Sequence, residues 1–160
     1  MFDGPAVLAA LKRCGVTHVV WLPDSELGRW DAALSSDPDL RLIRVCREGE
    51  AFAVAAGLFI GGKRPIVMIQ CTGLFEAGDA LRNVLFDLKL PLFVVVGVRS
   101  WLAHQKGATV DTCPHFTPRI LDAWGLQYVW LDEQRSPDDL ARAYLDAKAA
   151  GRPGAALYAE

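Results

Sequence analysis

Two glutamates, Glu48 and Glu50, begin an otherwise small and apolar run in the segment CREGEAFAVAAG, residues 46–57. The run predicts a helix whose first turn contains both carboxylates, where the positive end of the helix dipole favours acidic side chains. That local effect alone could explain the acids. Because successive helix residues are about 100° apart, Glu48 and Glu50 point about 200° apart, and at most one of them can face a given site.

The predicted helix behind these acids is rich in small residues. Small side chains let another backbone, a subunit or a flat ligand come close. The segment therefore joins a carboxylate that could exchange a proton to a surface that leaves room for a cofactor or a second chain. The residues concerned are Ala51, Ala53, Ala55, Ala56 and Gly57.

Other residue types capable of chemistry give weaker signals. The three histidines do not stand at metal-ligand spacings, and the four cysteines include no C-x-x-C pair, so no metal site is predicted. His18 begins a probable strand and is expected to be structural. His104 and His115 lie in or beside the longest irregular stretch, residues 99–115, where either could carry a proton or contact a substrate.

The elements that must position these residues follow from six apolar runs rich in Val, Ile and Leu. Several runs show little polar alternation, which is typical of strands covered on both faces, and the intervals between them can hold crossover helices. We expect an α/β fold with a doubly wound, mostly parallel six-stranded sheet and helices on both faces. Its binding crevice should lie beyond the carboxyl ends of the strands. The runs are 17–23, 40–46, 65–71, 91–98, 127–132 and 154–160, and the loops in question are 23–26, 46–50, 71–76 and 98–115.

Length and composition favour a single domain, residues 1–160, in which 52% of residues are hydrophobic and 22% charged. With 17 basic and 19 acidic residues, the net charge of −2 gives no reason to expect a nucleic acid or an anionic membrane as partner. No apolar run approaches the ~20 residues of a membrane span, and the first residues do not resemble a signal peptide. We therefore expect the chain in the reducing cytoplasm.

Three segments together resemble the pyrimidine-binding (PYR) domain of thiamine diphosphate-dependent enzymes: REGEAFAVAAG, GKRPIVMIQCTGL and LPLFVVVGVRS. The similarity is greatest to the α subunit of sulfopyruvate decarboxylase and to phosphonopyruvate decarboxylase, and it covers nearly the whole chain. Its most specific element is a glutamate nine residues before a helical glycine, a spacing that Glu48 and Gly57 match and Glu50 does not. The resemblance implies that Glu48 hydrogen-bonds N1′ of the cofactor's aminopyrimidine and is the catalytic acid.

The resemblance also suggests which other residues lie at the site. Pro23, Thr72 and Gly73 occupy loops where the family contacts the cofactor, thiamine diphosphate. Candidates for substrate contact are Ser25, Phe75, Arg99 and His115.

The sequence departs from these relatives directly after the third strand. They carry an S-G-L-G-N type turn, whereas this chain has Thr72-Gly73-Leu74-Phe75-Glu76. Phe75 replaces a glycine and Glu76 an asparagine, and both could reshape the substrate pocket. Arg99 could pair with an anionic substrate group, or it could be a solvated loop arginine. Asp24 and Ser25, in the loop after the first strand, could face the site or could be helix caps.

One element of the family is missing. The G-D-G motif that holds the diphosphate and Mg²⁺ does not occur in this sequence. The resemblance therefore implies a second subunit that carries the diphosphate-binding (PP) domain, in a hetero-oligomer such as α2β2 or larger, with the active site between subunits. The expected activity is decarboxylation of a 2-oxo acid. A carboligase subunit of the acetolactate synthase type, a non-catalytic module that keeps the fold, and a flavodoxin-like nucleotide-binding protein stay open as alternatives.

Overall fold

The computed structural model describes residues 2–25 and 27–160. Six strands form one sheet in the order β2-β1-β3-β4-β6-β5, and all neighbouring strands in it are parallel. Each strand falls within one of the six predicted apolar runs, so the predicted sheet is confirmed. The strands are β1 (His18–Trp21), β2 (Arg41–Arg44), β3 (Pro65–Gln70), β4 (Phe93–Val98), β5 (Tyr128–Leu131) and β6 (Gly154–Ala159).

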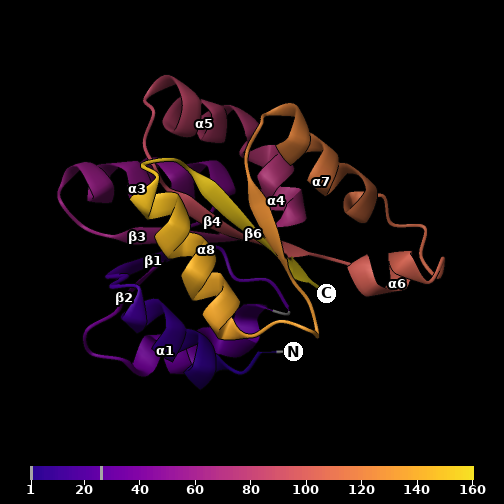
Figure 1. Ribbon diagram of the computed structural model, residues 1–160, viewed down its shortest axis with the longest axis horizontal. Helices are drawn as coiled ribbons and strands as arrows, with labels where there is room; N and C mark the ends of the chain where they lie inside the picture. Colours follow the sequence, from indigo (N-terminus) through magenta and orange to yellow (C-terminus); the bar gives the residue numbers. More distant parts are fainter. Residues whose placement is uncertain (1, 26) are drawn as a thin grey trace.

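Helices cover both faces of the sheet, as predicted (Figure 1). One face packs against α1 (Gly4–Arg13), the 3-10 helix η1 (Leu27–Trp30), α2 (Asp31–Ser36) and α8 (Pro137–Ala149). The other face packs against α3 (Glu48–Ile60), α4 (Cys71–Glu76), α5 (Gly78–Arg82), the π-helical turn η2 (Asn83–Asp87) and α7 (Cys113–Ala123). The short helix α6 (Trp101–Gln105) projects from the edge of the molecule (Figure 1).

The absence of polar alternation in the strands has a direct cause in this layering. Successive strand residues point to opposite faces, and in the central strands both faces are buried. In β3, for example, Met68 packs into the layer of α1 and α8, whereas Val67 and Ile69 pack into the layer of α3 and α7. All three are fully buried.

Two segments that the sequence predicts as loops contain helices. Residues 71–76 form α4 directly after β3, and residues 101–105 form α6 within the stretch predicted to be irregular. The reason for α6 is tertiary: the Trp101 ring stacks on Trp130 of β5 with centroids 3.8 Å apart, and the Leu102 amide donates to the Glu160 carbonyl at 3.0 Å. Neither contact is visible in local sequence.

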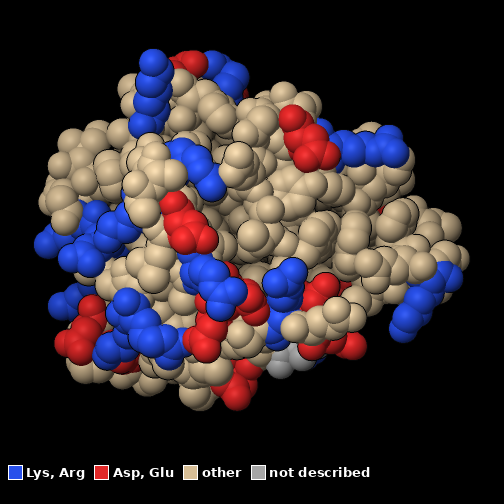
Figure 2. Space-filling view, in the orientation of Figure 1, with Lys and Arg blue, Asp and Glu red and all other residues tan. Residues whose placement is uncertain are grey.

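The surface carries both signs of charge. Figure 2 shows basic and acidic side chains interspersed on the face in view, over α1 and α8. Among the residues that the structure describes, no helix is both long enough and apolar enough to cross a membrane. Within the same residues, no three His, Cys, Asp or Glu side chains converge to hold a metal ion.

Candidate active site

The predicted site residues gather at one edge of the sheet. Strands β2, β1, β3 and β4 are consecutive neighbours and parallel, so their carboxyl ends meet at that edge. The chain leaves β1 for β2 on one side and returns to place β3 on the other, which makes the gap beside β1 a topological switch point. Directly after these strands come Pro23 and Ser25, Glu48, Thr72 and Gly73, and Arg99.

Glu48 is the first residue of α3, and its half-buried side chain lies against Gly73 of α4. A Cβ atom added at Gly73 would stand 2.5 Å from Cδ of Glu48 and closer still to Cγ and Oε1. Only glycine therefore leaves room for this carboxyl group. Within residues 2–25 and 27–160, no hydrogen bond or ion pair engages the Glu48 carboxylate, so it can receive a donor from a ligand.

Glu50 has a different role in the same turn. Its side chain is exposed, and Oε2 accepts a hydrogen bond from the Cys46 amide at 3.2 Å. This contact resembles one arm of a capping box, because a third-position acid reaches back to an amide before the helix. The two glutamates therefore point to different surroundings, as their angular separation predicts.

The residues on either side of Gly73, namely Thr72, Phe75 and Glu76, each contact other protein groups. Phe75 is half-buried and packs against the core layer of α3. Glu76 accepts hydrogen bonds from the Arg47 guanidinium and, at 3.1 Å, from the Gly49 amide. Thr72 is exposed, and its hydroxyl donates to Oε1 of Gln70 at 3.0 Å.

Arg99 lies at the carboxyl end of β4, and its side chain joins the beginning of the following loop to the end of that loop. Its Nε donates to Oδ2 of Asp111 at 2.9 Å, and Nη2 contacts the Cys113 sulfur at 3.5 Å. This ion pair, with the Cys113 amide, holds the pKa of Asp111 well below its usual range. The Arg99 side chain is still 49% exposed, so part of the guanidinium faces outward.

Among the described residues, no hydrogen bond or ion pair joins the remaining candidates to Glu48. In the segment after β1, Pro23 and Ser25 are exposed, and Oδ1 of Asp24 accepts from the Leu27 amide at 2.7 Å, which is the predicted capping role. His115 on α7 is half-buried, with its ring 4.9 Å from that of Phe116.

The other two histidines can be placed as well. His104 is exposed on α6, with its ring 6.1 Å from that of Trp101. His18 begins β1, as predicted, and partial burial lowers the pKa of its imidazole. In the part of the chain that the structure describes, no hydrogen bond or ion pair joins either histidine to the first turn of α3.

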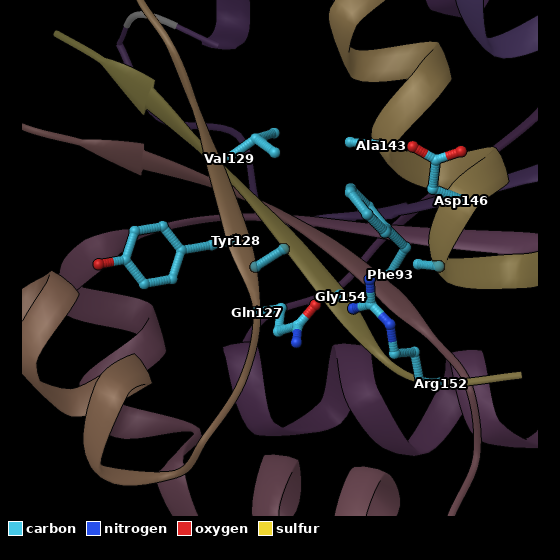
Figure 3. A pocket seen from close by; sticks show the side chains of 10 residues that line it. Phe93, Gln127, Tyr128, Val129, Ala143, Asp146, Arg152 and Gly154 are labelled. Carbon is cyan, nitrogen blue, oxygen red and sulfur yellow. The ribbon is translucent and has the colours of Figure 1, made fainter. Parts of the chain in front are cut away.

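A separate hollow lies at the opposite edge of the sheet (Figure 3). Its lining includes Phe93 and Gly154, which are the first residues of β4 and β6, together with Arg152 and residues of α8. The Tyr128 ring points to the other side of β5 (Figure 3). In a parallel sheet the amino ends of the strands lie opposite the carboxyl ends. This hollow lies at the amino ends of β4 and β6, so it is not part of the site around Glu48.

Sequence reasoning missed three residues that shape the site. Arg47 and Gly49 bind Glu76, and Asp111 binds Arg99. Arg47 and Gly49 stand 29 and 27 positions before Glu76, and Asp111 stands 12 positions after Arg99. No local signal could have joined them, because the fold alone brings them together.

The site fits the aminopyrimidine end of thiamine diphosphate. An aminopyrimidine ring nitrogen that is protonated can donate to a carboxylate, and Glu48 offers one that is half-buried and held in the cradle of Gly73. Residues 4–116 match the sequence family described as "Thiamine pyrophosphate enzyme, N-terminal TPP binding domain". The chain belongs to this family.

Individual relatives agree with this assignment. A sulfopyruvate decarboxylase of Methanosarcina acetivorans is 28% identical over 94% of this chain and 38% of its own length. A sulfopyruvate decarboxylase subunit alpha of Methanococcus maripaludis is 25% identical over 89% of this chain and 83% of its own length. A phosphonopyruvate decarboxylase of Streptomyces viridochromogenes is 28% identical over 93% of this chain. The chain thus spans 38% and 37% of the first and third of these relatives.

A solved structure supports the fold. The thiamine diphosphate-dependent 4-hydroxybenzoylformate decarboxylase of Rhodococcus jostii RHA1 superposes with a TM-score of 0.66. The match covers 98% of this chain and 29% of that protein, at 18% identity. At this level of identity the likeness shows a shared architecture.

Proposed function

We propose that this chain is the pyrimidine-binding subunit of a thiamine diphosphate-dependent decarboxylase that acts on a 2-oxo acid. The observation that carries the proposal is the Glu48 carboxylate, which makes no hydrogen bond or ion pair with the described residues and which Gly73 accommodates at the switch point of the sheet. The family match and the names of the relatives supply the class of cofactor and reaction.

In the proposed mechanism, Glu48 does the work of this chain. Bound thiamine diphosphate would supply a thiazolium ring that accepts the electrons released when a 2-oxo acid loses carbon dioxide. Glu48 would hydrogen-bond N1′ of the pyrimidine and hold a proton there. Pro23, Thr72 and Gly73, which follow β1 and β3, would contact the pyrimidine ring. Partial burial of Glu48 limits competition from water for that hydrogen bond.

The exposed outer face of α3 supports the proposal of a partner subunit. A helix that is apolar on all sides is normally buried, yet Ala53 and Gly57 are exposed here and Ile60 is 72% exposed. A covering chain at this face would reach the site, because Glu48 begins the same helix. We propose that this partner carries the diphosphate-binding domain with its Mg²⁺, in a hetero-oligomer such as α2β2 or larger.

The substrate would be a small anionic 2-oxo acid. The names of the relatives include sulfopyruvate and phosphonopyruvate. Both compounds are three-carbon 2-oxo acids with an additional negatively charged group. The exposed part of the Arg99 guanidinium could bind that group, while Asp111 holds the other edge of the guanidinium. Ser25, Phe75 and His115 are further candidates for substrate contact. The four free cysteines are in keeping with a reducing compartment, for which we propose the cytoplasm.

The test is reconstitution with a G-D-G-containing chain that copurifies with this one. Carbon dioxide release from sulfopyruvate, phosphonopyruvate and pyruvate is measured with and without thiamine diphosphate and Mg²⁺. We expect Glu48→Gln to lower kcat by about 10²- to 10⁴-fold, the usual contribution of a proton-transfer group.

Glu50→Gln is the matched control, because it changes an acid of the same helical turn that points elsewhere. It should keep most of the turnover. Near-normal turnover of Glu48→Gln would refute the assignment of Glu48. Failure of every 2-oxo acid to release carbon dioxide in the assembled complex would refute the decarboxylase itself.

A further inference from the structure

The N-terminus of α3 lacks a cap from its own N-cap residue. That residue is Arg47, whose backbone is extended (φ −144°, ψ 143°) and whose side chain makes no capping hydrogen bond. A guanidinium has only donors, so it cannot satisfy the free amides at a helix start. The acceptor comes instead from the end of α4, where Oε2 of Glu76 accepts from the Gly49 amide at 3.1 Å.

The same carboxylate also holds Arg47. Oε1 of Glu76 accepts from Nε of Arg47 at 3.1 Å and from Nη2 of the same guanidinium. The Arg47 hydrogen bond, followed by that of the Gly49 amide, lowers the pKa of Glu76. Arg47 and Gly49 are the two chain neighbours of Glu48, so one carboxylate binds the backbone amide that follows Glu48 and the side chain that precedes it.

We infer that Glu76 is a positioning residue for Glu48: by accepting from the Gly49 amide while it pairs with the Arg47 guanidinium, it holds the first turn of α3 in the conformation that presents the Glu48 carboxyl group. This inference rests on the proposed function and adds a residue through which Glu48 is controlled. Glu76 and Arg47 pair with each other, so the added acid does not leave an uncompensated charge beside Glu48.

The effect of Glu76 should be local rather than global. The Arg47 and Glu76 side chains are 76% and 35% exposed, and exposed ion pairs add little to overall stability. Helix ends, however, fray without a cap. Loss of Glu76 should therefore loosen the turn that carries Glu48 and leave the buried sheet intact.

The first measurement needs neither cofactor nor turnover. Amide hydrogen exchange is followed by NMR in the full chain without cofactor, for the wild type, Glu76→Ala and Glu76→Gln. We expect exchange at Gly49 to accelerate roughly fivefold in Glu76→Ala, in line with loss of one capping acceptor, and exchange in β3 to stay unchanged. Glu76→Gln keeps an acceptor for Gly49 but loses the ion pair, so it should lie between.

The second measurement uses the complex assembled with its partner. Glu76→Ala should lower kcat roughly tenfold or more, with a smaller change in KM, and Glu76→Gln should recover part of the loss. Asp79→Ala is the control, because it removes another exposed, ion-paired acid, in the neighbouring helix α5. It should change neither quantity.

The outcomes separate this inference from the proposed function. Unchanged Gly49 exchange in Glu76→Ala, or a loss of kcat without any change in that exchange, would overturn the positioning role. Near-normal turnover of Glu48→Gln would overturn the role of Glu48 whatever Glu76 does. Should Glu76→Ala not fold, Glu76→Gln and Arg47→Ala give the same two readouts.

Discussion

The close approach of Glu48 to Gly73 gives a quantitative prediction for Gly73→Ala. The new Cβ would lie 2.5 Å from Cδ of Glu48, whereas ordinary contact begins at 3.4 Å, so the carboxyl carbon must retreat by about 0.9 Å. The two helix backbones cannot separate easily, because Phe52 of α3 and Leu74 of α4 are fully buried beside them. The side chain of Glu48 must therefore move instead.

A displacement of about 1 Å at a catalytic group typically costs about 10²-fold in rate. We expect Gly73→Ala to lower kcat by about that factor in the assembled complex. Replacement of a helical glycine by alanine otherwise favours the helix by up to about 1 kcal/mol, so the unfolding temperature should change little. The assay is carbon dioxide release under saturating cofactor, with thermal unfolding followed by circular dichroism.

The control for this experiment is Gly78→Ala, in the segment that follows α4. A Cβ added at Gly78 would meet the Trp124 ring at 3.7 Å, which is ordinary contact. This variant should keep most of its turnover. Wild-type kcat in folded Gly73→Ala, or an equal loss of kcat in Gly78→Ala, would show that the close approach of Gly73 to Glu48 does not matter for turnover.

A double variant tests whether Gly73 acts through Glu48. If it does, Gly73→Ala combined with Glu48→Gln should be no slower than Glu48→Gln alone, because the displaced group is already inactive. A further loss of activity in the double variant would mean that Gly73 contributes in another way, such as direct contact with the cofactor.

Two more predictions follow from exposed positions. In the isolated chain, Gly57→Ala should stabilise α3 by about 0.5–1 kcal/mol, because nothing lies within 4 Å of the added Cβ; the same change should weaken binding of a partner that packs there, as measured by calorimetry. Because the folded-state pKa of Asp111 is depressed, the Arg99–Asp111 pair should stabilise the loop above the unfolded pKa of about 3.9 and lose that effect as pH falls below it. Asp111→Asn should abolish this pH dependence of loop protection in hydrogen exchange, and an unchanged profile would contradict it.

Much of the fold follows from the sequence because its signal is local. Buried parallel strands must be apolar on both faces, and the six apolar runs locate all six strands. Helix periodicity likewise separates Glu48 from Glu50, and the spacing to Gly57 selects Glu48 by resemblance to the family. The structure keeps that distinction, since Glu50 caps the turn while Glu48 lies over Gly73.

The contacts that shape the site belong to the tertiary structure. Arg99 reads as either a substrate ligand or a solvated side chain, and only the folded loop reveals its pairing with Asp111. Residues 71–76 and 101–105 read as loops, yet packing against neighbouring elements makes them helical. Propensity is a weak guide for such short segments because tertiary contacts override it.

The layered α/β sheet, the helix that carries Glu48 and the family of the chain can all be predicted from the amino-acid sequence. The surroundings of that glutamate depend on the folded chain, which places Gly73 beneath its carboxyl group and binds Glu76 to the residue on either side of it. The two kinds of information differ in their range along the chain. Burial and helix periodicity depend on the types of neighbouring residues. The hydrogen bond from the Gly49 amide to Glu76, 27 positions away, forms only when β3 and α4 place Glu76 beside α3.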